Sequence, residues 1–217
     1  MEQPPSSNAA QAAWTRLAGR IVDLSVSLAN GAPTYPGDPP FDLTPHDTLA
    51  TAGYNLARIT MGTHQGTHVD APFHFFDGAA TAERLDLAAC VGPALLVDLS
   101  HKQAGETITV DDFEPWSSRI SGGARLIYRT GWDARLGAPT YFTDFPSMTT
   151  DAARWLVNRG IALLGMDTPS PSADWKEVHE ILLGAGVIIL EELANLDQID
   201  AEEFVLLAAP LRLVGAD

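Results

Sequence analysis

The hydrophobic positions fall into short runs, and most of these runs are typical of β-strands. The segment 21-IVDLSVSL-28 alternates apolar and polar residues, which predicts a strand with one buried face. The segment 55-NLARITMG-62 predicts a second strand that leads into a histidine-rich stretch. Denser apolar runs predict five further strands, 94-ALLVDLS-100, 124-ARLIYRTG-131, 161-IALLGMD-167, 187-VIILEEL-193 and 204-FVLLAAPLRL-213.

Helical patterns are concentrated in the second half of the chain. Residues 150–160 begin with Thr and Asp and end at a glycine, and residues 174–184 also end at a glycine, so both predict helices. A short helix is expected at 14–19. Helices that alternate with apolar strands predict an α/β domain, whereas the strand-rich first half argues against a simple doubly wound sheet. We expect a disordered tail over 1–13 and a single domain over 14–217.

Composition narrows the class of protein. The 217 residues are 46% hydrophobic and 19% charged, which is ordinary for a globular enzyme. The net charge of −15 argues against binding to nucleic acid. The apolar runs are too short to span a membrane, and the N-terminus lacks the features of a signal peptide, so a cytoplasmic protein is expected. The single cysteine, Cys90, is expected to be a small core residue.

The candidate metal-binding residues are concentrated in 63-THQGTHVDAPFHFFDG-78, which holds three of the six histidines. Glycines and a proline make a helix improbable here, and an extended chain points His68 and Asp70 to one face. A flat strand would hold His64 about 13 Å from His68, too far for one ion, so we expect a bend at Gly66. Histidine and carboxylate are common ligands of zinc-type ions, so the segment predicts a metal site, with a water-facing histidine loop as the alternative.

Two distant residues are candidate partners of this segment. His179 lies on the apolar face of the helix 174–184, so it points inward, where it could be either a ligand or a core histidine bonded to a carbonyl. Glu191 ends the strand at 187–193, where α/β folds place their sites. Glu192 is the competing carboxylate.

These residues resemble the metal-dependent cyclase family, which includes the bacterial kynurenine formamidases. The signature H-x3-H-x-D-x3-H stands here as His64, His68, Asp70 and His74, and the His–x11–Glu pair as His179 and Glu191. The segments 33-PTYPGD-38 and 167-DTPS-170 are also similar to family motifs. The resemblance implies a mixed sheet in barrel-like β/β/α layers. It also implies two zinc ions per subunit, with manganese as the alternative, held by His64, His68, Asp70, His179 and Glu191. His74 would be the proton donor and acceptor.

The substrate remains open between several classes. Kynurenine formamidases of this family carry a tryptophan in the proline-rich loop, where this chain has Tyr35, a candidate substrate contact. The first hypothesis is hydrolysis of N-formylkynurenine by metal-activated water. The second is hydrolysis or cyclisation of another small amide, lactone or polyketide-like substrate, and the third is a non-catalytic metal-binding protein. The resemblance also implies a homo-oligomer, a dimer or a tetramer.

Overall fold

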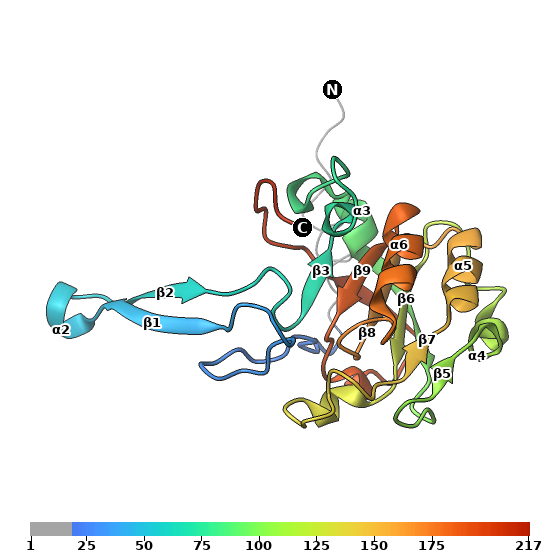
Figure 1. The fold of residues 1–217 in the computed structure, drawn as a ribbon, viewed down its shortest axis with the longest axis horizontal. Coiled ribbons are helices and arrows are strands. Elements are labelled where there is room, and N and C mark those ends of the chain that lie inside the picture. The colour runs from blue at the N-terminus through green and yellow to red at the C-terminus, as the bar shows by residue number, and fades with distance from the viewer. Residues whose placement is uncertain (1–18) are drawn as a thin grey trace.

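A six-stranded mixed sheet forms the centre of the molecule (Figure 1). The computed structural model describes residues 19–217, so the tail expected at 1–13 and nearly all of the helix expected at 14–19 lie outside the described residues. The strands, in their order across the sheet, are β10 (Glu203–Leu207), β4 (Val91–Asp98), β6 (Arg125–Arg129), β8 (Leu163–Met166), β9 (Ile188–Glu191) and β3 (His68–Asp70).

The four inner strands are parallel, and the two edge strands run antiparallel to their neighbours. The helix α5 (Thr150–Asn158) connects β6 to β8, and α6 (Trp175–Gly184) connects β8 to β9. The predicted α/β alternation in the second half of the chain is therefore confirmed. The expected mixed sheet of an α/β fold is also confirmed, and the described sheet has two open edges and does not close into a barrel.

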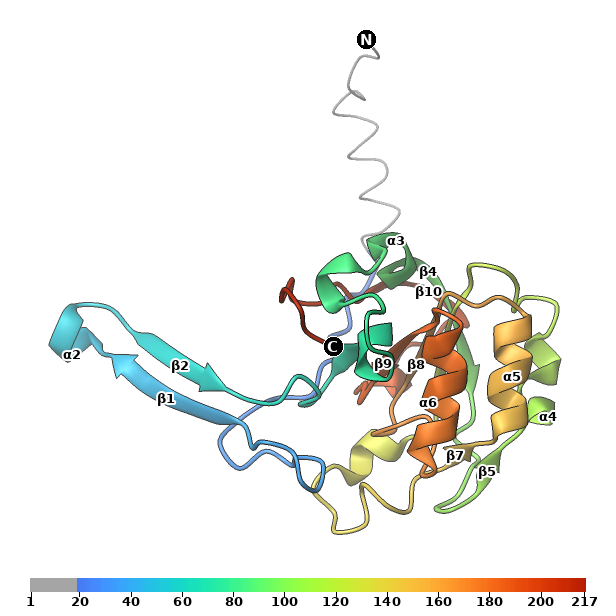
Figure 2. The same ribbon diagram turned by 45° about the horizontal axis from the view of Figure 1, so that its top comes forward.

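Alternation along the inner strands gives the sheet two apolar faces. On β4, Leu95 and Val97 belong to the core under α5 and α6, whereas Ala94 and Leu96 belong to a second cluster on the opposite face. The two helices lie side by side on the first face (Figures 1 and 2). Cys90 is fully buried in the second cluster, as predicted.

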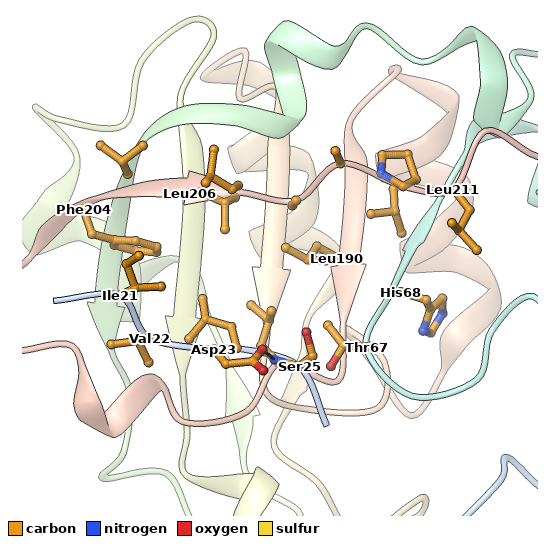
Figure 3. A pocket seen from close by; sticks show the side chains of 18 of the residues that line it. Ile21, Val22, Asp23, Ser25, Thr67, His68, Leu190, Phe204, Leu206 and Leu211 are labelled. Carbon is orange, nitrogen blue, oxygen red and sulfur yellow. Dashed lines mark hydrogen bonds between the residues drawn. The ribbon is translucent and has the colours of Figure 1, made fainter. Parts of the chain in front are cut away.

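The opposite face carries an open apolar groove of about 1400 Å³ (Figure 3). Leu190, Phe204 and Leu206 line it, and residues 21–25 cross it. The strand predicted at 21–28 is wrong, because this segment is held by isolated bonds rather than by a ladder. Thr67 Oγ1 accepts a hydrogen bond from Val26 N, and Leu24 O accepts one from Ala194 N.

A long arm extends from the body of the protein (Figure 1). It consists of β1 (Asp42–Asp47) and β2 (Leu56–Thr60), joined by the short helix α2 (Leu49–Ala52). The strand predicted at 55–62 is confirmed, but its partner β1 was not predicted, because the sequence DLTPHD is polar and contains a proline. The arm exposes Leu43, Leu56 and Ile59.

Short elements complete the described chain. The last strand ends at Leu207 rather than at the predicted residue 213, and the chain then returns to β3, where Asp217 O accepts a hydrogen bond from Ala71 N. Within residues 19–217 no helix is long and apolar enough to cross a bilayer. The remaining strands and α-helices are α3 (Leu87–Cys90), β5 (Thr107–Ile108), α4 (Val110–Phe113) and β7 (Ser147–Met148). The 3₁₀ helices are η1 (Pro72–His74), η2 (Ala82–Arg84), η3 (Glu114–Trp116), η4 (Trp132–Arg135) and η5 (Leu196–Gln198).

Candidate active site

A sharp bend at Gly66 brings the first histidine back to the metal-binding segment, as the sequence predicted. Gly66 has φ of 65°, a left-handed conformation that other residues rarely adopt. A Cβ there would lie 2.8 Å from Leu28 Cδ2 and 2.9 Å from Val26 Cγ2. The bend places His64 Nδ1 2.9 Å from Asp70 Oδ1. Any other residue here would be strained, and the side chains of Leu28 and Val26 would have to shift.

Pairing of β3 with β9 sets the next contacts. The register puts His68 opposite Glu191 and Asp70 opposite Ile189. Because alternate residues share a face, His68 and Asp70 point to the same side. His68 Nε2 lies 3.2 Å from Asp70 Oδ1 and 3.4 Å from Glu191 Oε2.

The helix α6 supplies the third histidine from its buried face. Val178 and Leu182 pack into the core, so the neighbouring His179 also points inward. Its Nε2 lies 3.2 Å from Glu191 Oε1 and 3.5 Å from Asp70 Oδ2. The five predicted ligands therefore converge, with Asp70 at their centre.

Backbone carbonyls fix the orientation of two of these histidines. His68 Nδ1 lies 2.7 Å from Gly66 O, and His179 Nδ1 lies 2.6 Å from Trp175 O. A carbonyl oxygen only accepts hydrogen bonds, so each Nδ1 carries a proton. In the neutral ring Nε2 is then unprotonated, and its lone pair faces the carboxylates. Among the described residues, His68 Nε2 and both oxygens of Asp70 are buried without a hydrogen-bond partner.

These groups fit a binding site for cations. Burial disfavours protonation of His179, yet Asp70 and Glu191 outweigh it and raise its pKa to about 10. The carboxylates of Asp70 and Glu191 therefore favour a positive charge beside them. One donor group comprises His64, His68 and Asp70, and a second comprises Asp70, His179 and Glu191, with the donor atoms of each group within 4.8 Å of one another. The two groups share Asp70, and their donor atoms suit the binding of a metal ion.

His74 lies beside this centre rather than within it. It ends η1, which begins at Pro72, and its ring centroid is 3.9 Å from that of His64. Burial lowers the pKa of His74, and the neighbouring His64 adds to this effect, although Asp70 opposes it. The lowered pKa favours the neutral form of His74.

The proline-rich loop is tied to the histidine segment by Gln65, which the sequence did not single out. The buried Gln65 donates from Nε2 to Pro33 O at 2.8 Å and accepts from Thr34 Oγ1 at 2.8 Å. Next to these contacts, Tyr35 meets Phe142 edge to face, with ring centroids 5.6 Å apart. Tyr35 is 39% exposed, so part of this residue faces solvent.

Asp217 is a second residue that sequence reasoning missed. Its Oδ2 lies 3.1 Å from His64 Nε2 and 3.3 Å from His74 Nδ1. Partial burial opposes its ionisation, but hydrogen bonds from Thr63 and His64 outweigh this and lower the pKa of Asp217 to about 2. No local pattern near Asp217 indicates this contact, because its partners lie more than 140 residues away.

The DTPS segment supports the site from outside the donor group. The buried Asp167 accepts four hydrogen bonds from Thr130 and Gly131. Thr168 O accepts from the backbone N of Glu192, which follows the predicted ligand Glu191 and has φ of 54°. This segment therefore holds the turn at the end of β9.

The chain is similar in sequence to curated relatives over about nine-tenths of its length. A kynurenine formamidase of Bacillus mycoides is 35% identical over 201 residues, which cover 90% of this chain and 92% of the relative. That of Bacillus cereus is 36% identical over 200 residues, with the same coverage.

Solved structures superpose on 90 to 100% of the chain. The isatin hydrolase A of Ralstonia solanacearum superposes with a TM-score of 0.85 at 26% identity, covering 100% of this chain and 95% of that one. That of Labrenzia aggregata, solved with benzyl benzoate bound, gives 0.86 at 28% identity, covering 98% and 95%. A protein of Bacillus stearothermophilus described as a predicted metal-dependent hydrolase gives 0.75 at 31% identity, covering 90% and 92%. The Cyclase family model matches residues 22–173, so with these relatives the chain belongs to the cyclase family of metal-dependent hydrolases.

Proposed function

We propose that this protein is a metal-dependent hydrolase of a small aromatic amide, with the formamide of N-formylkynurenine as its first candidate substrate. The observation that carries the proposal is the pair of donor groups that share Asp70, with His74 beside them. The kynurenine formamidase relatives, which match about nine-tenths of the chain, support this chemistry.

The residues divide into two sets of ligands and one proton carrier. His64, His68 and Asp70 would hold one ion, and Asp70, His179 and Glu191 a second. When bound, such cations polarise a carbonyl group and acidify water. Zinc suits a set rich in histidine, and manganese is the alternative.

His74 supplies the proton transfer that breaking the amide bond requires. In its neutral form it takes a proton from the water that attacks the carbonyl carbon. The new C–O bond forms, the C–N bond breaks, and the same proton passes to the leaving nitrogen. The lowered pKa of His74 keeps the ring neutral before this cycle begins.

The aromatic preference rests on the exposed Tyr35, which packs edge to face on the partly buried Phe142. We propose Tyr35 as a contact for the aromatic ring of the substrate, because tyrosine offers a rigid apolar face. The second candidate is hydrolysis of a cyclic aromatic amide, supported by the superposition on two isatin hydrolases.

One assay separates the two substrates and tests Tyr35. Protein reconstituted with zinc or manganese would be given N-formyl-L-kynurenine, isatin and an aliphatic formamide of similar size. We expect turnover of at least one aromatic substrate, and in Tyr35→Ala a higher KM for it, with Tyr35→Phe close to the unmodified protein. Faster turnover of the aliphatic formamide than of both aromatic compounds would contradict the proposal.

A homo-oligomer, either a dimer or a tetramer, is also proposed. The projecting β1–β2 arm exposes apolar side chains that a second copy could bury. Light scattering should give a mass above that of the single chain, and Ile59→Asp should lower it. A monomeric mass for the unmodified protein would rule the oligomer out.

A further inference from the structure

The three histidines of the cation centre differ in what holds their second ring nitrogen. For His68 and His179 a backbone carbonyl accepts from Nδ1, which leaves Nε2 facing the centre. His64 is turned the other way, since its Nδ1 faces Asp70 and its Nε2 points outwards. The acceptor for this outer nitrogen is a side chain rather than a backbone carbonyl, because Asp217 Oδ2 lies 3.1 Å from His64 Nε2.

The same oxygen also meets the proposed proton carrier. Asp217 Oδ2 lies 3.3 Å from His74 Nδ1, and one carboxylate oxygen can accept two hydrogen bonds. Donation from His74 Nδ1 leaves Nε2 of that neutral ring as the nitrogen that exchanges protons. The single carboxylate thus fixes the tautomers of two neighbouring imidazoles.

We propose that Asp217 is a positioning residue that orients His64 towards the cation and His74 towards the substrate. This inference rests on the proposed function for its His74 half, whereas its His64 half concerns metal binding alone. Carboxylates that hold the outer nitrogen of a metal-binding histidine raise its basicity, and their loss weakens metal binding by about 10–100-fold.

A third cation bound by His64, His74 and Asp217 is the competing interpretation, since their donor atoms also lie within 4.8 Å of one another. His64 would then have to bind cations through both nitrogens. A neutral imidazole has only one unprotonated nitrogen. This arrangement would therefore need His64 to lose its remaining N–H proton and become an imidazolate anion. When His64 Nε2 instead donates a hydrogen bond to Asp217, the His64 ring stays neutral.

The tail that carries Asp217 is held independently of its side chain. Ala71 N donates to the backbone oxygen of Asp217 at 2.6 Å, and Ala82 N donates to Ala216 O at 2.9 Å. Gly215 N donates to Glu83 Oε2 at 3.2 Å. Substitution of the Asp217 side chain therefore leaves these contacts in place, which makes the residue suitable for a clean test.

The test measures zinc affinity first, without substrate. Zinc would be titrated into metal-stripped protein against a chromophoric chelator, for the unmodified chain, Asp217→Ala and Asp217→Asn. We expect binding about 10–100-fold weaker in Asp217→Ala and an intermediate loss in Asp217→Asn, which keeps one acceptor oxygen. The control Asp200→Ala removes an exposed acid of the loop before β10 and should change the affinity less than about twofold.

Kinetics at saturating zinc test the His74 half of the inference. With the substrate that the unmodified protein turns over, kcat should fall about tenfold or more in Asp217→Ala while KM changes little. If no tested substrate reacts, the proposed function fails, but the zinc titration still shows whether Asp217 orients His64. The two failures can therefore be told apart.

Three outcomes would overturn the inference. The first is unchanged zinc affinity and kcat in both Asp217 variants. The second is the loss of a whole equivalent of zinc at unchanged affinity for the rest, which would indicate a third cation site. The third is a parallel fall in the melting temperature of both metal-free variants, which would show that Asp217 holds the fold rather than the imidazoles.

Discussion

His179 on α6 and Glu191 at the end of β9 meet with Nε2 3.2 Å from Oε1, although twelve residues separate them in the chain. Both are buried, and both face Asp70 or its partner His68. A helix and the strand that follows it thus supply two of the five donor side chains, while the Gly66 bend and β3 supply the other three.

Replacement of His179 should remove one of the two cations. His179→Ala leaves Asp70 and Glu191 without their third ligand, so bound zinc should fall from two equivalents to one, with activity reduced about a hundredfold or more. Elemental analysis of the dialysed protein measures this directly. The exposed His101, which lies outside the donor groups, gives the matched control His101→Ala. Two equivalents retained by His179→Ala would show that α6 supplies no ligand.

The pH dependence of activity should report the neutral form of His74. Burial lowers the pKa of His74 from 6.5, so the base is active above that lowered pKa and is lost as the pH falls through it. Bound cations would lower this pKa further. The profile of kcat/KM should therefore show an acid limb centred below pH 6.5. An acid limb centred above pH 7 would be inconsistent with this assignment.

Gly66→Ala should damage both stability and metal binding. Alanine at a left-handed position costs about 1–2 kcal/mol, and its contact with Val26 and Leu28 adds about 1–3 kcal/mol. Gly105 has φ of 74°, and a Cβ added there would meet nothing within 4 Å, so Gly105→Ala isolates the backbone cost. Urea unfolding of both variants separates the two contributions. An equal loss of unfolding free energy in Gly66→Ala and Gly105→Ala would mean that Val26 and Leu28 move away from the added methyl group at no cost.

Asp167→Asn should destabilise the fold without removing a ligand. The amide nitrogen would face N–H donors of Thr130 and Gly131 that now bond to a carboxylate. Buried donors left without acceptors cost about 1–3 kcal/mol each, so a loss of about 2–4 kcal/mol is expected. Chemical unfolding measures the loss, and zinc affinity in folded protein should be retained. An unchanged free energy of unfolding would show that the DTPS turn tolerates the amide.

Much of this arrangement was predictable because it depends on local patterns. Alternation and apolar runs predicted the inner strands, and the glycine at position 66 predicted the bend that joins His64 to Asp70. The apolar face of α6 predicted that His179 points inward. Each of these inferences needs only neighbouring residues and the geometry of one element.

The errors concern contacts that only the tertiary structure creates. Residues 21–28 alternate as a strand does, but they cross the sheet face and bond to Thr67 and Ala194 instead of a neighbouring strand. The β1 strand is polar because it pairs with β2 in an arm outside the body. Gln65 and Asp217 act through partners distant in sequence, so no spacing rule could identify them.

The most direct test of the central claim is turnover as zinc is titrated into metal-stripped protein. Hydrolysis of an aromatic amide, with N-formyl-L-kynurenine tried first, should rise with added zinc and level off at two equivalents. His74→Ala should bind the same zinc yet stay nearly inactive. Turnover that does not depend on added metal, or a His74→Ala variant as active as the unmodified protein, would contradict the account.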